Sequence, residues 1–232
     1  MKKLIVAEVF NSIQGEGQTM GVPSVFLRLG GCNLLCKSET WICDSIEVWQ
    51  KGKAIPFPEI FDTENLNKLR DGFHLIITGG EPLIHDSALI DFLNWFSEEY
   101  NFLPTIEIET NGTILPSFDL TDLIYYWNVS PKLKNSGEPY AKRMNEIALD
   151  RLKQLGERTI FKFVVTNQMD ILEMLEEYGS FINMNQVVLM AAGSNREELE
   201  KVRQTVAEIC IQFNFRYSER LHIVIWNQKT GV

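Results

Sequence analysis

The sequence has little that would place the protein in or across a membrane. No hydrophobic run is long enough to span a bilayer, and the first residues show no clear cleavage site of a signal peptide. The apolar stretch after Lys3 is short and is interrupted by Glu8, so we expect a β-strand there. These absences predict a protein that has no membrane partner and is not exported.

Positive charge is also scarce. The 232 residues contain 22 Lys and Arg against 31 Asp and Glu, which gives a formal net charge of −9. Nucleic-acid-binding proteins need clustered Lys and Arg for their phosphate contacts, so this composition argues against a nucleic-acid partner. Hydrophobic residues make up 45% of the chain, which is ordinary for a globular protein. The length suits one sizeable domain, and we expect residues 1–232 to form it.

Cysteine is rare, but Cys32, Cys36 and Cys43 lie close together in the sequence. Closed zinc sites usually have four protein ligands, whereas three thiolates suit an iron–sulfur cluster that leaves one iron open for chemistry. Cys210 falls on the apolar face of an expected helix and is interpreted as a buried small hydrophobe. The alternative is a zinc-stabilised binding module, which would need a further ligand. Clustered thiols without an export signal favour the reducing cytoplasm.

Short β-rich runs alternate with amphipathic helical stretches along the chain. Strands are expected at residues 4–10, 24–30, 73–78, 104–109, 126–129, 160–166, 186–190 and 221–226. Helices are expected at residues 62–70, 86–99, 119–125, 142–155, 168–178 and 195–213. The last helix has the clearest pattern, because Ser194 and Glu197 form a capping box ahead of apolar residues at helical spacing. The alternation predicts an α/β protein with a parallel sheet or barrel.

Polar and Gly-rich signals fall directly after expected strands. They are Gly31-Cys32, Thr78-Gly79-Gly80-Glu81-Pro82, Glu109-Thr110-Asn111-Gly112, Ser130-Pro131-Lys132 and Met190-Ala191-Ala192-Gly193. In a parallel barrel the carboxyl ends of the strands form one face, and active sites lie there. Five such signals on one face indicate an enzyme more strongly than any one of them.

Each signal also has a structural interpretation. Gly79-Gly80 is compatible with a tight turn, and Glu109 and Lys132 are compatible with solvated charges. His222 opens the last expected strand, where the pattern alone assigns it no role. The functional interpretation therefore depends on the signals being close together in space.

These residues resemble those of a known superfamily. Cys32-x-x-x-Cys36 with a third cysteine, followed by Gly79-Gly80-Glu81 after a strand, resembles the radical S-adenosylmethionine (SAM) superfamily. Within it, the chain resembles nearly end to end the 7-carboxy-7-deazaguanine synthases of the queuosine and 7-deazapurine pathway. The motifs that carry the closer resemblance are residues 12–17, 25–32, 43–45, 77–82, 109–112, 129–132 and the tail 221–232. The loop between the second and third cysteines is longer than the usual superfamily spacing.

The resemblance implies an incomplete, TIM-like βα barrel of the radical SAM type. It also implies that Cys32, Cys36 and Cys43 hold a 4Fe-4S cluster whose open iron binds SAM. The residues implied in cofactor binding are Ile42, Cys43, Asp44, Gly80, Glu109, Asn111, Ser130, Pro131, Lys132 and Met190. No catalytic residue is implied beyond these cofactor ligands and the substrate ligands.

The substrate implied by the resemblance is 6-carboxy-5,6,7,8-tetrahydropterin. Its carboxylate needs a cation, and Arg28 is the expected bidentate partner. The other residues implied in substrate binding are Ile13, Gln14, Gly15, Glu16, Thr78 and Val232. Mg²⁺ is implied as a further cofactor with Ser45 as its protein ligand, because a hydroxyl is a suitable hard oxygen donor.

The resemblance also implies a reaction, a lyase activity. Reduction by an electron donor such as flavodoxin would cleave SAM to methionine and a 5′-deoxyadenosyl radical, which would abstract hydrogen at C6 of the pterin. Ring contraction and loss of ammonia would then give 7-carboxy-7-deazaguanine. A cytoplasmic homodimer is expected. The nearest alternative is another small radical SAM enzyme, such as a glycyl-radical activase, which would act on a protein and not on a pterin.

Overall fold

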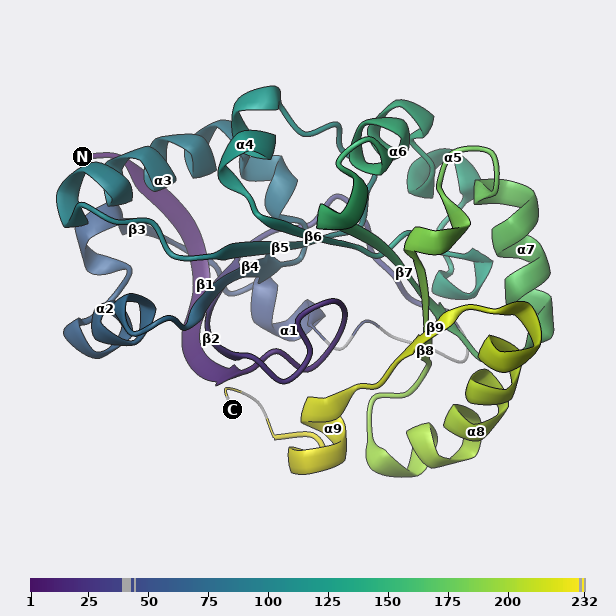
Figure 1. The fold of residues 1–232 in the computed structure, drawn as a ribbon. Helices are drawn as coiled ribbons and strands as arrows, with labels where there is room; N and C mark the ends of the chain where they lie inside the picture. Colours follow the sequence, from purple (N-terminus) through teal and green to yellow (C-terminus); the bar gives the residue numbers. More distant parts are fainter. Residues whose placement is uncertain (39–42, 44, 230, 232) are drawn as a thin grey trace.

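The computed structural model describes residues 1–38, 43, 45–229 and 231, and its strands form one curved sheet (Figure 1). The strands are β1 (Lys3–Ile13), β2 (Pro23–Leu29), β3 (Lys53–Pro56), β4 (His74–Gly79), β5 (Ile106–Thr110), β6 (Tyr126–Val129), β7 (Thr159–Val165), β8 (Val187–Ala191) and β9 (Arg216–Ser218). Their spatial order is β3-β1-β2-β4-β5-β6-β7-β8-β9, so β3 and β9 are the two edges. The sheet therefore curves toward a barrel without closing, which confirms the predicted incomplete βα barrel.

Most of the sheet is parallel. β2 and the strands from β4 to β9 pair in parallel, while β1 pairs antiparallel with both β2 and β3. The carboxyl ends of the parallel strands therefore lie at one edge. β4 is almost continuously apolar and buried, as is typical of a parallel strand covered on both faces. β5 differs, because Glu107 and Glu109 alternate with apolar residues and share one face of the sheet.

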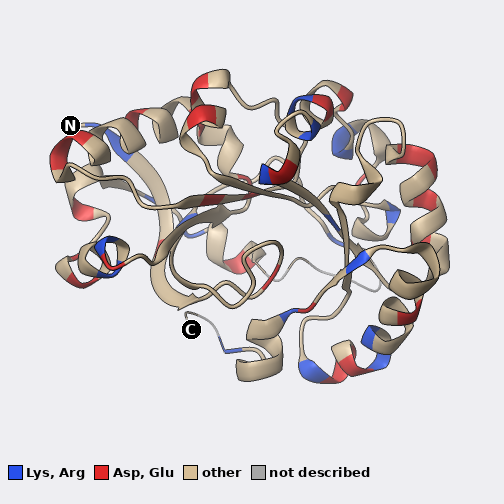
Figure 2. Ribbon diagram, in the orientation of Figure 1, with Lys and Arg blue, Asp and Glu red and all other residues tan. Residues whose placement is uncertain are grey.

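The helices lie mainly along the outside of the curved sheet (Figure 1). They are α1 (Ile46–Trp49), α2 (Thr63–Arg70), α3 (Asp86–Tyr100), α4 (Phe118–Leu123), α5 (Tyr140–Arg143), α6 (Glu146–Lys153), α7 (Gln168–Tyr178), α8 (Arg196–Phe213) and α9 (Leu221–Trp226). α2 packs on β2, α3 on β1, α7 on β7 and α8 on β8. Figure 2 shows charge of both signs over the outer helices, and acidic residues also occur on β5 within the sheet. Within the described ranges, no helix combines the length and apolar character needed to cross a membrane.

Most of the predicted elements are confirmed. The strands expected at 24–30, 126–129 and 186–190 correspond to β2, β6 and β8, and the helix expected at 168–178 is α7. The prediction of one helix over 142–155 is partly wrong. Met144 and Asn145 adopt extended backbone conformations there, and they separate α5 from α6.

The prediction of a strand over 221–226 is wrong, because these residues form α9. The position beside β8 is occupied by the short strand β9, which the sequence did not indicate. The β-branched residues of the segment favour a strand by propensity, but that preference depends on a free place in the sheet. His222 therefore lies in a helix near the open side of the barrel.

The predicted capping box of α8 is wrong by one residue. Asn195 is the N-cap, and its side chain accepts the Glu198 backbone N–H at 3.0 Å. The Glu198 carboxylate in turn accepts the Ser194 backbone N–H at 2.7 Å. Asn caps a helix as well as Ser does, so the start of the helix is preserved although the pair of residues differs. Cys210 on this helix is 5% exposed, which confirms it as a buried small side chain.

Candidate active site

The polar signals at the strand ends lie together in the structure. Gly80, just after β4, is so close to the loop after β2 that an added Cβ would lie 2.2 Å from the Gly31 carbonyl oxygen and 2.6 Å from the Cys32 Cβ. The Glu81 backbone N–H donates to the same Gly31 oxygen at 3.0 Å. Only glycine fits this close approach. It holds the end of β4 against the segment that begins at Gly31 and carries Cys32, Cys36 and Cys43, which we call the cysteine loop.

Glu81 is a buried acid that connects the ends of β4 and β5. Its carboxylate accepts hydrogen bonds from the Thr110 hydroxyl at 2.7 Å and from the Asn111 backbone N–H at 2.6 Å. It also accepts the Leu83 backbone N–H at 3.0 Å. Burial raises the pKa of Glu81, and these hydrogen bonds oppose the shift. Glu81 therefore organises the strand ends, a role that the motif in the sequence did not identify.

Cys32, Cys36 and Cys43 are free thiols near one another. Burial raises the pKa of Cys32 to about 11, and Glu81, Cys36 and Cys43 act in the same direction. The pKa of Cys36 is also raised, mainly by burial. Cys43 adds to this increase, and the nearby Lys132 cation opposes it. The three sulfur atoms therefore interact electrostatically. Thiols in this setting become thiolates when a bound cation compensates their charge, as in a metal or cluster site.

The number and type of these side chains bear on what they could hold. In the part of the chain that the structure describes, no three His, Cys, Asp or Glu side chains are grouped so as to hold one metal ion. A cluster of several irons and sulfides is larger than one ion and holds its thiolates further apart. Three cysteines are one fewer than the four ligands of closed zinc sites, and cysteine thiolates are the usual ligands of iron–sulfur clusters, so the number and type of ligands favour a cluster.

Asn111 and Lys132 lie at the edge that carries the cysteine loop. The Asn111 side-chain NH₂ donates to the side-chain Oδ1 of Asn33 at 2.9 Å, within the cysteine loop. The Lys132 ammonium donates to the Ser130 hydroxyl at 3.0 Å, and the Lys132 carbonyl accepts the Tyr178 hydroxyl at 2.6 Å. Pro131 lies between Ser130 and Lys132, so this predicted segment is fixed from both its side chains and its backbone.

The loop between β1 and β2 brings Gln14 to the inner face of β5. The Gln14 Nε2 donates to Glu107 at 2.6 Å and to Glu109 at 3.1 Å. The Thr78 hydroxyl, near the end of β4, donates to the other oxygen of Glu109 at 2.7 Å. Three predicted site residues, Gln14, Thr78 and Glu109, are therefore joined in one hydrogen-bonded group, which we call the Gln14 group. Glu107 belongs to it as well and was not predicted, although a buried-strand pattern broken by two acids was a visible signal.

Glu16 lies in the same loop and is bound by two cations. Its carboxylate pairs with Lys162 on β7 and with Arg220 at 2.9 Å. Burial alone would raise the pKa of Glu16, but Lys162 and Arg220 outweigh it and hold the pKa well below its usual range. Gly15 packs so closely on His222 that an added Cβ would lie 2.2 Å from the His222 Nδ1. Lys162 and Arg220 were not predicted, because one charged residue in an apolar context has no spacing to recognise.

Arg28 lies on β2 beside Thr78, its register partner on β4. Partners in a parallel pair point to the same face of the sheet, so Arg28 faces the side on which Thr78 bonds Glu109. The guanidinium pairs with Glu8 at 2.8 Å and lies 5.7 Å from the centre of the Phe10 ring. Its side chain is 18% exposed. The result is an oriented, partly accessible cation at the edge of the Gln14 group.

The structure describes three of the other predicted site residues. Met190 is buried in β8, and Ile13 is the last residue of β1. Ser45 is the N-cap residue of α1. Three predicted residues lie outside the described part of the chain: Ile42, Asp44 and Val232.

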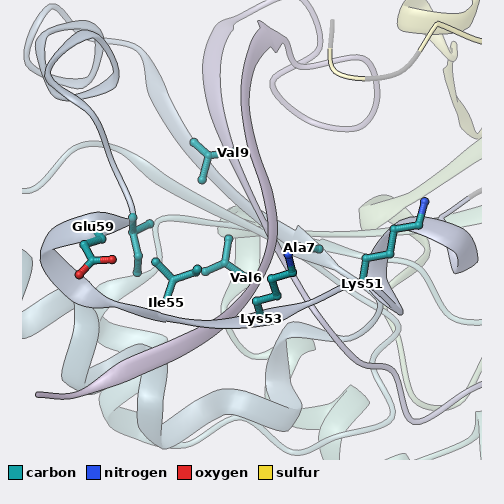
Figure 3. Close-up of a pocket in the computed structure, with 8 residues that line it drawn as sticks. Val6, Ala7, Val9, Lys51, Lys53, Ile55 and Glu59 are labelled. Atoms are coloured by element: carbon teal, nitrogen blue, oxygen red, sulfur yellow. The ribbon is translucent and has the colours of Figure 1, made fainter.

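A separate open hollow of about 360 Å³ lies beside β1 and β3 (Figure 3). Its lining residues are Val6, Ala7, Val9, Lys51, Lys53, Ile55, Glu59 and Ile60. Figure 3 shows Val6 and Ile55 close together in the middle of this mostly aliphatic lining. The hollow includes none of the predicted site residues, and ligand sites usually combine apolar walls with several converging polar groups. The candidate active site is therefore the strand-end edge and not this hollow.

Comparisons with known proteins agree with the cysteine and strand-end features. Residues 13–130 match a family model described as "4Fe-4S single cluster domain". The 7-carboxy-7-deazaguanine synthase of Halobacterium salinarum is 35% identical over 246 aligned positions, which cover 97% of this chain and 91% of that protein. The synthase of the same name from Pyrobaculum aerophilum is 30% identical and covers 97% and 96% of the two chains.

A solved structure is similar as well. The crystal structure of QueE from Escherichia coli superimposes with a TM-score of 0.65 at 28% sequence identity, and the match covers 95% of each chain. The agreement therefore extends over nearly the whole sheet and its helices, and is not confined to the cysteine loop.

Proposed function

Because the chain belongs to the family of 7-carboxy-7-deazaguanine synthases and is a radical SAM enzyme, we propose that its strand-end site converts 6-carboxy-5,6,7,8-tetrahydropterin to 7-carboxy-7-deazaguanine. This reaction contracts a ring and releases ammonia, in queuosine biosynthesis. The observation that carries the proposal is that the cysteine loop and the Gln14 group meet at one edge of the sheet. Gly80 packs on the cysteine loop, while Thr78 on the same strand bonds into the Gln14 group.

Cys32, Cys36 and Cys43 would hold the 4Fe-4S cluster. The cluster and SAM, when bound and reduced, supply the radical that removes a hydrogen atom from C6 of the pterin. The chain holds these thiols in a largely buried setting that raises the pKa of Cys36, and Lys132 acts in the opposite direction as a nearby cation. Glu81 and Gly80 hold Gly31 and Cys32, at the start of the cysteine loop, against the end of β4.

The residues proposed to bind SAM are those that border the cysteine loop. Gly80 exposes backbone without a side chain, and Lys132 offers a cation for a carboxylate. Asn111 and Ser130 add polar groups, and Met190, which is buried in β8, is the apolar member of the proposed set. The remaining members of the proposed set are Glu109, Pro131, Cys43, and Ile42 and Asp44 from outside the described residues.

The proposed pterin site is the Gln14 group with Arg28. The guanidinium of Arg28 would bind the substrate carboxylate in a bidentate manner, and Glu8 orients it from behind at 2.8 Å. Gln14, Gly15 and Glu16 would contact the pterin ring through the loop between β1 and β2. Thr78, Ile13 and Val232, which lies outside the described residues, complete the proposed set.

Further expectations concern metal, partners and location. Ser45 would donate a hydroxyl oxygen to Mg²⁺, which keeps water or substrate oxygens as its other ligands. We propose flavodoxin as the electron donor, a homodimer as the assembly, and residues 1–232 as one radical SAM domain. The cytoplasm is the proposed location, because thiolate ligands persist in a reducing compartment.

One experiment tests the activity directly. Protein reconstituted with iron and sulfide without oxygen, then reduced, is incubated with SAM, Mg²⁺ and 6-carboxytetrahydropterin, and mass spectrometry is expected to detect 7-carboxy-7-deazaguanine. Cys43→Ala, expected to lose the intact cluster by iron and sulfide analysis, is the control. Formation of 5′-deoxyadenosine without the deazaguanine would overturn the substrate assignment alone. A full cluster that forms neither product would contradict the radical SAM activity itself.

A further inference from the structure

Glu107 is an unusual residue for its place in the sheet. It lies in β5 and is fully buried, at 0% exposure. Its register partner on β4 is Ile76, which is equally buried. The neighbouring strand therefore fills this level of the sheet with an apolar side chain, whereas a buried carboxylate is costly unless donors satisfy it. The burial of Glu107 therefore depends on the hydrogen-bond donors around its carboxylate.

Three donors from two segments meet the Glu107 carboxylate. Gln14 Nε2 donates at 2.6 Å, and the Asn128 side-chain amide on β6 donates to the same oxygen. The Thr19 hydroxyl donates to the other oxygen. Gln14 and Thr19 both belong to the loop between β1 and β2, so Glu107 holds that loop at two points.

The contact with Glu107 also fixes which way the Gln14 amide faces. A glutamine amide has a donating NH₂ and an accepting carbonyl, and the two exchange places when the amide turns over. Here the NH₂ bridges Glu107 and Glu109, while the carbonyl accepts the Glu16 backbone N–H at 3.3 Å. A turned amide would present its oxygen to two carboxylates and leave the Glu16 N–H facing a donor. Glu107 thus sets the amide direction and, through Glu16, the loop backbone.

We propose that Glu107 is a positioning residue for substrate recognition, which acts by fixing the amide of Gln14 and the loop that receives the pterin. This proposal rests on the proposed function, because that function makes Gln14 a substrate ligand. Glu107 itself does not touch the substrate, since its exposure is 0% and both its oxygens are engaged within the protein.

The surroundings of Glu107 indicate that the length of its side chain matters more than its charge. Burial raises the pKa of Glu107 to about 7, and Glu109 raises it further, while Thr19, Gln14 and Lys162 lower it. A neutral side chain of the same length is therefore a close substitute. Glutamine at this position keeps one oxygen for Gln14 and Asn128, and its NH₂ can donate to the Thr19 hydroxyl oxygen.

Two conservative variants separate length from charge. Glu107→Gln keeps the length and removes the charge, whereas Glu107→Asp keeps the charge and withdraws the acceptor from Gln14 by one methylene. Dissociation constants for 6-carboxytetrahydropterin and for SAM are measured separately by anaerobic calorimetry on the reconstituted protein. Glu107→Asp is expected to weaken pterin binding about tenfold, the cost of losing one hydrogen bond. Glu107→Gln keeps the contacts, so its dissociation constant for the pterin is expected to stay within about threefold of the wild-type value. SAM binding is expected to be unchanged in both.

A double-mutant cycle with Gln14→Ala tests whether Glu107 acts through Gln14. In the Gln14→Ala background, Glu107→Asp is expected to cause no further loss of pterin affinity, because the group that it positions is absent. Asp170→Asn is the matched control. Asp170 is a buried acid in the first turn of α7 whose recorded hydrogen bonds are with Thr166 and Asn167 and not with the Gln14 group, so its loss should lower the melting temperature but leave pterin affinity unchanged.

The outcomes distinguish the proposal from its premise. Wild-type protein that binds SAM but not the pterin would overturn the proposed function. Wild-type protein that binds the pterin, with Glu107→Asp unchanged or Glu107→Gln as weak as Glu107→Asp, would overturn the positioning role while the proposed function stands. Equal weakening of pterin and SAM by Glu107→Asp would also overturn it, because it would mean a general structural role.

Discussion

Two charged residues on the inner face of the sheet, Arg28 and Glu107, are held in different ways. Arg28 is partly exposed and has Glu8 as its ion-pair partner, so its planar guanidinium keeps donors for a ligand. Glu107 is fully buried, and donors from Gln14, Thr19 and Asn128 occupy both its oxygens. Substitutions at the two positions should therefore change different quantities: ligand affinity for Arg28, and geometry and stability for Glu107.

Arg28→Ala should weaken binding of the pterin roughly thirtyfold, because a charge-assisted bidentate pair with the substrate carboxylate is lost. Iron content and SAM affinity should be unchanged, since the contacts recorded for the Arg28 side chain among the described residues are with Glu8 and Phe10. Arg28→Lys should fall between wild type and Arg28→Ala, because it keeps the charge and loses the planar fork. Calorimetry with the pterin measures all three. An unchanged affinity in Arg28→Ala would mean that another cation binds the carboxylate.

The titration of Glu107 leads to a prediction about stability. Burial raises its pKa from 4.5 to about 7, so the folded protein binds this proton more tightly than the unfolded chain does. Stability from this group is complete below pH 4.5 and is lost as the pH rises to about 7. Glu107→Gln has no such loss. Its free energy of unfolding relative to wild type should therefore rise over this range, by roughly 3 kcal/mol in total, and level off above it.

Urea unfolding of both proteins at several pH values measures this difference. The comparison with wild type removes the contributions of all other titrating groups that the two proteins share. A difference that does not change with pH would mean that Glu107 titrates at the same pH in the folded and unfolded states. In that case its three hydrogen bonds would fully compensate its burial.

At the scale of elements, the contact between β4 and the cysteine loop depends on one missing side chain. Gly80→Ala would place a Cβ 2.2 Å from the Gly31 carbonyl oxygen, which is backbone and cannot move without moving the loop. Reconstituted Gly80→Ala should therefore hold less cluster per chain, measured as iron and acid-labile sulfide. Gly72→Ala is the control, because Gly72 has a φ of 97° and nothing within 4 Å. It should lower stability by about 1 kcal/mol through backbone strain and keep its cluster. Equal cluster content in the two variants would contradict a steric role for Gly80.

The elements themselves were largely predictable from local pattern. Alternating strands and helices, and polar signals at strand ends, indicated the parallel sheet and the edge that carries the site. The segment 221–226 shows where local pattern fails: its β-branched residues favour a strand, but β9 already occupies the edge beside β8. Which segment takes the last place in a sheet is decided by the whole fold and not by the segment.

The site was predictable in part for the same reason. Gln14, Thr78 and Glu109 belong to recognisable motifs, and they do meet in the structure. Glu107 and Lys162 belong to no motif, and their contacts are distant in sequence: Gln14 and Glu107 are 93 residues apart. Contacts of this kind follow from the curvature and register of the sheet, which a linear pattern does not contain.

At the scale of the whole molecule, hydrogen bonds and an ion pair join two parts of the chain that are far apart in sequence. The loop between β1 and β2 lies beside the C-terminal region (Figure 1), where the Leu221 backbone N–H donates to the Gly15 carbonyl at 2.8 Å. The Gly17 backbone N–H donates to the Ser218 hydroxyl at 2.9 Å. Arg220 pairs with Glu16 at 2.9 Å. The loop between β1 and β2 is thus held by β5 on one side and by the C-terminal region on the other.

The ion pair between Arg220 and Glu16 leads to a prediction for the stability of the whole fold. Arg220→Met keeps much of the side-chain volume but leaves the buried Glu16 with Lys162 and, when its ring is protonated, His222 as ion-pair partners. It should therefore lower the free energy of unfolding by roughly 2 kcal/mol at neutral pH. Arg203→Met is the matched control. Arg203 pairs with Glu200 on the exposed face of α8, and its loss should cost less than about 1 kcal/mol.

The pH dependence of this loss separates the ion pair from simple packing. Lys162 and Arg220 hold the pKa of Glu16 well below 4.5, so the stability from Glu16 is present above that pH and is lost as the pH falls through the lowered value. Removing Arg220 moves the pKa of Glu16 back toward 4.5, so the variant has less of this stability to lose. The difference between wild type and Arg220→Met should therefore shrink as the pH falls below 4.5. A difference in the free energy of unfolding that stays constant below pH 4.5 would mean that Arg220 stabilises the fold by packing and by backbone contacts. Its charge opposite Glu16 would then contribute little.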